Sequence, residues 1–226
     1  MFTYRDYYDI ISAVAGEDIK LFLRHDVDMS TAKALEMAER ERKMRIGPAV
    51  YFIMVTSEFY NPFEKESAER INKILDLGHR IGLHYDLSLM PDDDRERSRI
   101  IATQAMMLEG IFGQQIIHIS AHKPFMGVKP SIDLLEALRA VNLDDVNHKL
   151  DNYKYISDSG MIFRDDPFVV AKNHKLIHLN IHPEWWSTKE MGWQEKMLDL
   201  DLEYDMRRKV FSHLKHLKSY REKVMK

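Results

Sequence analysis

Histidine and acidic residues recur at the ends of four apolar runs of this chain, and within each run they keep one alternation phase. The runs are residues 21–28, 80–86, 116–122 and 176–182. Because successive side chains of a β-strand point to opposite faces, residues two apart lie on the same side. The polar residues that share a side by this rule are Asp26 with Asp28, His84 with Asp86, His118 with His122, and His178 with His182. Polar groups that converge from the ends of several strands are typical of a metal site or an acid/base site.

The two acids at the end of the first run could divide the work of a hydrolase. One of Asp26 and Asp28 could ligate a metal ion while the other accepts a proton from water, since a cation beside one carboxylate separates their pKa values. His84 is a candidate ligand, because neutral imidazole binds zinc and related divalent ions. His122 and His182 stand at equivalent strand ends, and the pattern leaves open which is a further ligand and which a general acid.

The composition allows one substantial core and excludes some classes of function. A chain of 226 residues with 45% hydrophobic content fits a single domain over 1–226. Its 33 basic and 36 acidic residues leave a net charge of -3, so we expect no nucleic-acid partner. The chain has no cysteine, so any metal must be held by histidine, aspartate or glutamate.

The two ends of the sequence bear on localisation and assembly. Residues 1–9 carry acids and tyrosines where a secretory signal needs a basic flank and an apolar run. No later stretch approaches about 18 apolar residues, so we expect a cytoplasmic protein without membrane insertion. Residues 193–224 have a mostly helical pattern whose apolar stripe needs a partner surface, either the rest of the domain or a second copy in a homo-oligomer.

Strand and helix patterns alternate along most of the chain, which predicts an α/β fold with a parallel sheet. After the first run, Ser30 or Thr31 can cap a helix that reaches about Arg45. Further helices are expected over 62–77, 91–112 and 131–141, and strands over 48–55, 80–85, 116–121 and, with weaker patterns, 144–148 and 168–171. If the sheet closes into a parallel barrel, the polar strand ends gather at its carboxyl end, where active sites lie.

Four segments, in order, resemble the motifs of the NodB-type polysaccharide deacetylases, carbohydrate esterase family 4. Residues 23–28 resemble the first motif in its His-Asp-Val-Asp variant, and residues 78–86 resemble the second, in which Gly-His-x-Ile-Gly precedes the metal histidine. Residues 120–124 stand where the proline-containing third motif belongs, and residues 181–186 where the late histidine motif belongs. The resemblance therefore covers most of the chain.

The resemblance implies a distorted (β/α) barrel of about seven parallel strands and removal of an N-acetyl group from an amino sugar or saccharide. It implies Asp26 as the catalytic base, Asp28 and His84 as metal ligands, and His182 as the acid that protonates the departing nitrogen. The implied cofactor is a divalent metal, first Zn2+, with Co2+, Ni2+, Fe2+ or Mn2+ as alternatives. Such an ion polarises the acetyl carbonyl and lowers the pKa of its bound water.

One position departs from the family pattern. The family places a second metal histidine four residues after the first, and here that position is Ser88. We expect His122 to replace it, because His122 ends a strand in the right phase. His25 is the rival, although it points to the other face of a regular strand. Either Ser88 marks a weakened metal site, or one of these histidines completes it.

Other side chains are expected to support the catalytic groups or to contact the substrate. Asp158 and Arg164 lie in a region that resembles the fourth motif, where they would support the catalytic histidine or base. Tryptophan suits a sugar site because its ring has a large apolar face. The residues expected to contact the substrate are His25, Asp86, Lys123, Pro124, Trp185 and Trp186. His118 and His178 are expected to be buried and hydrogen-bonded inside the barrel.

Simpler interpretations and other functions stay open. The paired acids could only cap the next helix, and His84 with Asp86 could be a structural pair. A glycosidase without metal is disfavoured, because acids two residues apart on one strand are too close to flank a sugar. Two alternatives remain: a metal-dependent amidohydrolase that acts on a non-sugar amide, and a non-catalytic barrel that binds a saccharide or a partner protein. Ser88 favours the second of these.

Overall fold

The computed structural model describes residues 2–122 and 130–200. The chain divides into two compact units, Met1–Glu190 and Met191–Lys226. The first unit contains the whole β-sheet and the candidate site. In the second unit, α8 covers Trp193–Asp199, and the remainder of the helix predicted over 193–224 lies outside the described residues.

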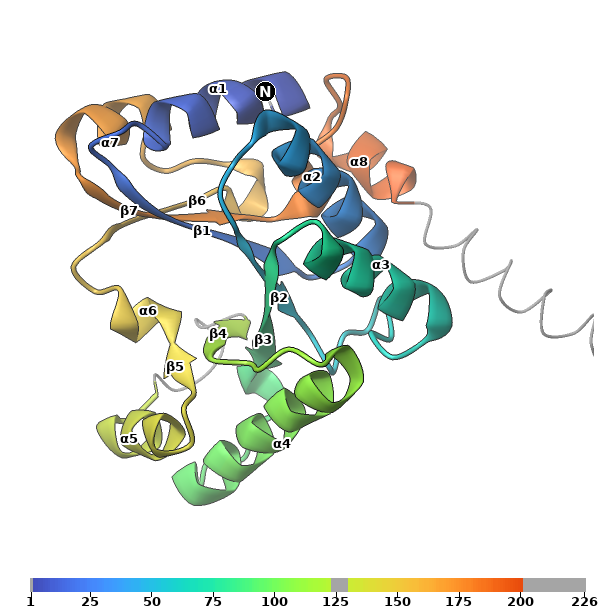
Figure 1. Cartoon of the computed structure of the whole chain (residues 1–226), viewed down its shortest axis with the longest axis vertical. Helices are drawn as coiled ribbons and strands as arrows, with labels where there is room; N and C mark the ends of the chain where they lie inside the picture. Colours follow the sequence, from blue (N-terminus) through green and yellow to red (C-terminus); the bar gives the residue numbers. More distant parts are fainter. Residues whose placement is uncertain (1, 123–129, 201–226) are drawn as a thin grey trace, which may run out of the picture. The chain divides into compact units, whose positions relative to one another are not determined.

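Seven parallel strands form one sheet (Figure 1). They are β1 (Lys20–Val27), β2 (Val50–Ile53), β3 (Arg80–Asp86), β4 (His118–His122), β5 (Asp144–Asp145), β6 (Lys154–Ser157) and β7 (Leu176–Ile181). The order across the sheet is β5-β4-β3-β2-β1-β7-β6, and each neighbouring pair is parallel. Within the described residues, β5 and β6 are the edge strands and do not pair with each other. The predicted distorted barrel of about seven parallel strands is confirmed, in an open form.

Helices connect the strands and pack in neighbouring pairs. They are α1 (Tyr4–Val14), α2 (Thr31–Met44), α3 (Lys65–Asp76), α4 (Asp94–Phe112), α5 (Ile132–Ala140), α6 (Val146–Lys149) and α7 (Pro167–Asn173). Short 3-10 helices follow three strands: η1 (Leu87–Leu89), η2 (Ser159–Met161) and η3 (Pro183–Trp185). In Figure 1, α1 lies beside α7, α2 beside α3, and α4 beside α5.

Local cap chemistry explains where the long helices begin and end. The Ser30 hydroxyl accepts a hydrogen bond from the Lys33 backbone N–H and starts α2. Asp93 does the same for the Glu96 N–H at the start of α4. That helix ends at Gly113, whose φ of 67° is a left-handed conformation that glycine adopts without steric cost. Both helices are therefore confirmed.

The prediction of a strand over 168–171 is wrong. Asp166 accepts hydrogen bonds from two backbone N–H groups of the next turn, and Pro167 occupies the first helical position, so α7 forms there. The sixth strand of the sheet is β6 instead. The strand predicted over 144–148 is short, because Asp145 ends it and caps α6 with its side chain.

The alternation phase of the four runs is confirmed by burial. The apolar side chains of one phase lie in the main core: Leu23, Val27, Ile81, Leu83, Ile119, Ile177, Leu179 and Ile181. The strand register places Asp26 level with Phe52, and His84 level with Ser120. The second phase therefore faces the inside of the curled sheet, and its polar residues approach one another from β1, β3, β4 and β7.

A buried carboxylate joins helices and strands on the outer side of the sheet. Glu41 of α2 accepts hydrogen bonds from the hydroxyls of Tyr7 and Tyr51. Its Oε1 also lies 2.8 Å from His25 Nε2. Burial favours the neutral form of Glu41, but His25 and the other partners outweigh it and hold the pKa of Glu41 below its ordinary value. This cluster fixes His25 on the side of β1 that faces α2.

Gly82 of β3 faces the inside of the sheet, where neighbouring groups leave no room for a side chain. A Cβ there would lie 2.8 Å from a Phe52 ring carbon and 2.8 Å from the His118 carbonyl oxygen. We expect Gly82→Ala to lower the free energy of unfolding by about 2 kcal/mol in urea denaturation. Gly110→Ala is the control, because no atom lies within 4 Å of its Cβ position on α4. Equal destabilisation by both substitutions would contradict this account.

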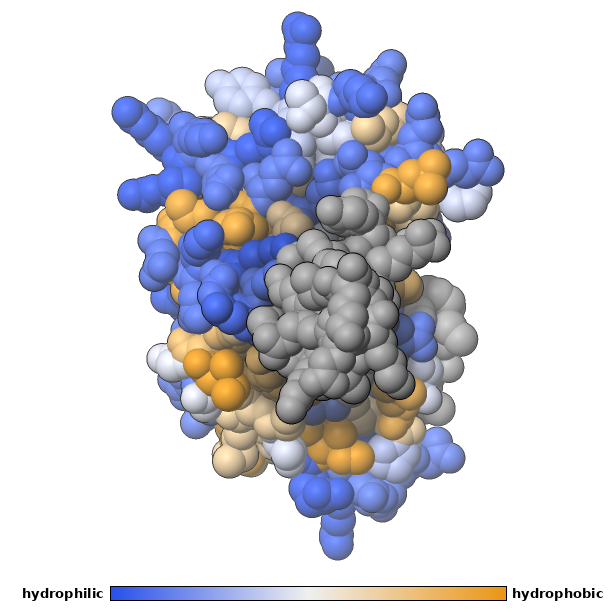
Figure 2. Space-filling view, turned by 90° about the vertical axis from the view of Figure 1, so that its right-hand side faces the viewer, coloured by the Kyte–Doolittle hydropathy of each residue, from blue (hydrophilic) through white to orange (hydrophobic). Residues whose placement is uncertain are grey.

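Hydrophilic side chains cover much of the face shown in Figure 2, and apolar side chains form separate patches among them. None of the described helices is both long and apolar enough to cross a membrane.

Candidate metal centre

Three side chains near the carboxyl ends of β1, β3 and β4 direct one donor atom each at a common point. His84 Nε2 lies 3.3 Å from Asp28 Oδ1, His122 Nδ1 lies 3.3 Å from the same oxygen, and the two nitrogens are 3.3 Å apart. In a tetrahedral zinc site with bonds of about 2.0–2.1 Å, two ligand atoms are about 3.3 Å apart. The triangle therefore has the dimensions of one face of such a site.

The chemistry of the three donors also fits a cation. His84 Nδ1 lies 3.0 Å from the Ser120 carbonyl oxygen, which can only accept, so Nδ1 carries a proton and Nε2 is the nitrogen left to bind a cation. Asp28 Oδ1 is buried and has no partner of regular hydrogen-bond geometry in residues 2–122 and 130–200. Within the described residues, Asp28, His84 and His122 are the group with suitable metal-ligand spacing.

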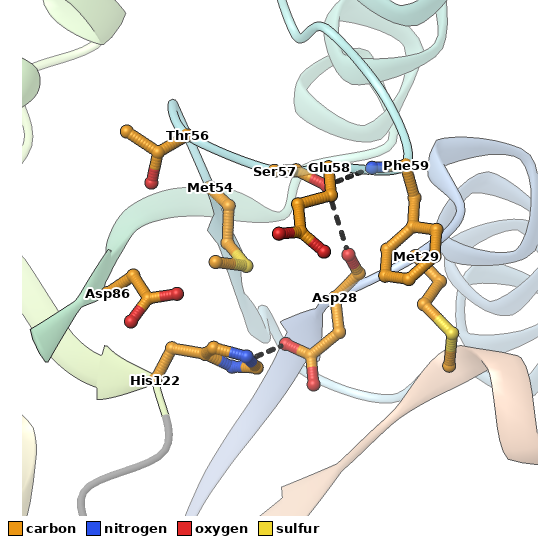
Figure 3. A pocket seen from close by; sticks show the side chains of 9 residues that line it. All are labelled: Asp28, Met29, Met54, Thr56, Ser57, Glu58, Phe59, Asp86 and His122. Atoms are coloured by element: carbon orange, nitrogen blue, oxygen red, sulfur yellow. Dashed lines mark hydrogen bonds and ion pairs between the residues drawn. The ribbon is translucent and has the colours of Figure 1, made fainter. Parts of the chain in front are cut away.

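Asp28 is held in its ionised form. Burial opposes the charge, but His122 and His84 outweigh it and hold the pKa of Asp28 well below its ordinary value. Figure 3 shows the Asp28 carboxylate facing the His122 ring at the wall of a pocket. An ionised carboxylate and two imidazoles form a ligand set that suits Zn2+ and similar divalent ions.

Asp26 lies beside this triangle with one oxygen bound and one free of hydrogen bonds. Its Oδ2 accepts from Arg24 at 2.7 Å and from Asn180 at 2.9 Å, while Oδ1 is buried and has no hydrogen-bond partner among the described residues. Burial opposes the charge, but the Arg24 guanidinium, and then His84 and His182, lower the pKa of Asp26 to about 2. Asp26 therefore stays ionised, and Oδ1 can accept a proton.

His182 is the fifth group of the site, and Asp158 orients it. His182 Nδ1 lies 2.6 Å from Asp158 Oδ1, and the His182 backbone N–H donates to the same carboxylate. The Trp186 indole N–H donates to Asp158 Oδ2 at 2.8 Å. His182 Nε2 then faces Asp26 and Asp28, 3.9 Å from Oδ2 of each. Burial disfavours the imidazolium, but Asp158 outweighs it and raises the pKa of His182 well above its ordinary value.

Some residues expected at the site lie elsewhere. His25 is wrong both as a ligand and as a substrate contact, because it is buried on the opposite side of β1 with Glu41. Trp186 is wrong as a sugar-contacting ring, because its side chain is 0% exposed. Arg164 is exposed and lines a different pocket. Lys123 and Pro124 lie outside the described residues.

The other expected residues keep positions near the site. Asp86 lines the pocket, and its Oδ1 accepts from the Ser88 hydroxyl at 2.6 Å and from the Ser88 N–H. Ser88 thus binds Asp86 and takes no part in the triangle. The partly buried Trp185 ring has its centroid 6.4 Å from that of His182, so the two rings are neighbours.

The two histidines expected to be structural lie deeper inside the sheet. The Phe22 ring contacts both His118 and His178 edge to face. Burial, and then Arg24, lower the pKa of His178 to about 3, so this ring is neutral. The expected hydrogen bonds are incomplete, because His118 Nδ1 and His178 Nε2 are buried without a partner in the described part of the chain.

Arg24, Asn180 and Ser120 were not among the expected site residues, although alternation could have identified all three. Arg24 is two residues before Asp26, and Asn180 is two residues before His182, so each shares the phase of the catalytic candidates. Ser120 lies between His118 and His122 in the same phase. None of the three is an acid or a histidine, the residue types from which the candidate site was predicted.

Arg24 is expected to stabilise the site through its buried ion pair with Asp26. Its side chain is 3% exposed, and its removal leaves the buried carboxylate without its main counter-charge. We expect Arg24→Met to lower the free energy of unfolding by about 3 kcal/mol and to raise the pKa of Asp26. Urea denaturation and the acidic limb of the pH–rate profile measure these effects. The double variant Arg24→Met/Asp26→Leu is expected to be less destabilised than Arg24→Met alone. If the losses in free energy of unfolding from the two single substitutions simply add in the double variant, the ion pair does not stabilise the site as described.

No protein-family model and no curated protein matches this sequence. Two solved structures match at a TM-score of 0.50. One is a pseudoenzyme of carbohydrate esterase family 4 from Bacillus anthracis, 15% identical, with 81% of this chain and 60% of that chain covered. The other is a mutant of such a pseudoenzyme with restored enzymatic activity, 13% identical, with 84% of this chain and 62% of that chain covered. This chain thus spans about three fifths of the length of the structures that it matches. It has the fold of carbohydrate esterase family 4, the family that its motifs resemble.

Proposed function

We propose that this chain is a metal-dependent hydrolase that removes the acetyl group from an N-acetylated saccharide. The observation that carries the proposal is the 3.3 Å triangle of Asp28, His84 and His122, with Asp26 and His182 beside it. Asp28, His84 and His122 would hold a divalent ion. When bound, the ion would polarise the acetyl carbonyl and lower the pKa of water at the site.

The protein groups would divide the proton transfers of amide hydrolysis between them. Asp26 is held at Oδ2 by Arg24 and Asn180, so its Oδ1 would accept the proton of the attacking water. His182 would donate its Nε2 proton to the amine nitrogen as the C–N bond breaks, since an amine anion is too poor a leaving group. The products are acetate and the free amine.

Asp158 is expected to set the pH range in which His182 acts as an acid. Asp158 raises the pKa of His182, so its replacement by asparagine lets His182 lose its proton at lower pH. We therefore expect the alkaline limb of the kcat profile to move to lower pH in Asp158→Asn. Below that limb, where His182 stays protonated, kcat is expected to fall less than it falls at higher pH. A pH–rate series on wild type and variant measures the shift. An unchanged or upward-shifted limb would contradict the role of His182 as the acid.

The proposal is tested by metal loading and amine release on the same preparation. Protein purified without chelator and loaded with Zn2+ or Co2+ is expected to release amine from N-acetylglucosamine oligomers. Asp28→Ala is expected to remove both the metal and the activity. Amine release only from small non-sugar amides would instead support the amidohydrolase alternative, which needs the same catalytic groups.

The non-catalytic alternative is supported by one observation, that a matched structure is a pseudoenzyme. In the hydrolase proposal His122 would take the place that Ser88 leaves open, so the candidate ligand set would have three members. Substoichiometric metal after loading, together with saccharide binding and no amine release, would favour the binding protein over the hydrolase.

A further inference from the structure

A cavity of about 290 Å3 opens beside the candidate metal centre. Asp28 and His122 lie in its wall, so a molecule that reaches the centre through this cavity contacts the residues that surround it. The volume is at the small end of the range for ligand pockets, which favours one compact unit over several. Side chains at its mouth can therefore determine which unit enters.

One wall of this cavity belongs to the loop of residues 54–60, which is tied to the end of β1. The buried Tyr60 hydroxyl donates to the Val27 carbonyl at 2.7 Å. The Ser57 hydroxyl donates to the Asp28 carbonyl at 3.2 Å. These bonds hold the loop in place before a ligand arrives, so its exposed side chains are preorganised.

The charged groups around the cavity are mostly acidic. In Figure 3 the carboxylates of Glu58 and Asp86 point into the same space as that of Asp28. Of the described residues that line the cavity, none is lysine or arginine. A divalent cation would carry two positive charges against the three carboxylates of Asp28, Glu58 and Asp86, so the described wall of the cavity would keep a net negative charge. Such a wall repels anions and accepts hydrogen bonds from hydroxyl or amine groups.

An aromatic ring stands on the opposite side of the cavity from Asp86. Phe59 lines the cavity and is 51% exposed, and Figure 3 shows its ring beside Met29. A large apolar ring that is held at a pocket mouth without being buried offers a flat face for stacking. The C–H face of a sugar ring fits such a surface.

We propose that Glu58 and Phe59 are specificity determinants of this site, an inference that rests on the proposed function. Phe59 stacks on the acetylated sugar unit. Glu58 accepts hydrogen bonds from its hydroxyl or amine groups and rejects substrates that carry a phosphate close to that unit. Neutral saccharides are therefore preferred over sugar phosphates and nucleotide-linked sugars.

The test compares a neutral with an anionic substrate on metal-loaded, full-length protein. We expect a kcat/KM at least about tenfold higher for N,N′-diacetylchitobiose than for UDP-N-acetylglucosamine. Glu58→Gln is expected to narrow that ratio about five- to tenfold, the effect of one like charge across the cavity. Glu17→Gln is the matched control, because Glu17 is exposed in the turn before β1, at the other end of the strand. It is expected to leave the ratio unchanged.

Calorimetric titration of the metal-loaded Asp26→Asn variant with the same two ligands measures binding with little turnover, and Glu58 and Phe59 are replaced in that background. We expect Phe59→Ala to weaken diacetylchitobiose binding about three- to tenfold and Glu58→Gln to improve UDP-N-acetylglucosamine binding. Equal preference in wild type, or a ratio that Glu58→Gln does not change, would overturn the assignment even if deacetylation is seen. Absence of amine release from either sugar would count against the proposed function, and the binding ratios would still decide the role of Glu58.

Discussion

Replacing Asp26 by asparagine is expected to lower kcat about 10³-fold while the metal content stays the same. Asparagine keeps the size of the side chain but cannot accept the proton that the Asp26 Oδ1 would take. The metal is retained because Asp26 is not a member of the triangle formed by Asp28, His84 and His122. Single-turnover amine release and metal analysis on the same sample measure the two effects.

Asp28→Ala is the matched comparison for that result, because the two acids are two residues apart on the same side of β1. Metal is expected to disappear from Asp28→Ala and to remain in Asp26→Asn. Equal metal loss from both variants would mean that Asp26 is itself a ligand. Unchanged turnover in Asp26→Asn would mean that another group takes the proton.

Replacing His122 by alanine is expected to weaken Zn2+ binding at least about 100-fold. His122 supplies one of the three donor atoms, and Ser88, at the position where the resembled family has its second histidine, binds Asp86 instead. Competition of the purified variant with a chromogenic chelator measures the affinity. The alanine at 122 leaves Asp28 and His84 as two ligands, too few for a stable site.

His118→Ala is the control for this substitution. His118 lies on the same strand in the same phase, at its other end, and is not a member of the triangle. It is expected to lower stability, because its ring contacts Phe22, but to leave the Zn2+ affinity unchanged. If His122→Ala binds Zn2+ as tightly as wild type, then His122 is not the residue that completes the ligand set.

The two-residue period of strands explains why the site could be predicted as far as it was. The phase places polar residues of β1, β3, β4 and β7 on one side, and the parallel sheet brings the carboxyl ends of those strands together. The alternation therefore places five side chains near one another without any knowledge of contacts: Asp26, Asp28, His84, His122 and His182. The alternation does not distinguish the roles of His122 and His182, because His182 differs from His122 by its contact with Asp158, which lies on another segment.

Burial and long-range pairing account for the failures at the site. Trp186 follows His182 closely in sequence, yet its ring is turned into the core, where the indole N–H donates to Asp158. Arg164 was expected to support the site, but Arg24 is the arginine that binds Asp26. The position of Arg24 in an apolar strand indicated that it has a charged partner, since arginine is seldom buried without one.

The errors in the predicted secondary structure also have local causes. Residues 168–171 are rich in residues that favour strands, but the Asp166 cap and Pro167 specify a helix. α1 was not predicted, although its signal is present: Thr3 and Asp6 form a capping box, and a stripe of apolar residues follows at helical spacing. In both cases the cap residues carried more information than the composition of the segment.

A crystal structure of the zinc-soaked protein tests the central claim most directly, because the anomalous signal locates the ion independently of activity. We predict one strong peak about 2.0–2.2 Å from Asp28, from His84 Nε2 and from His122 Nδ1, with Asp26 and His182 outside its first coordination sphere. A peak bound by other residues, or no peak at this position in zinc-saturated crystals, would contradict the account.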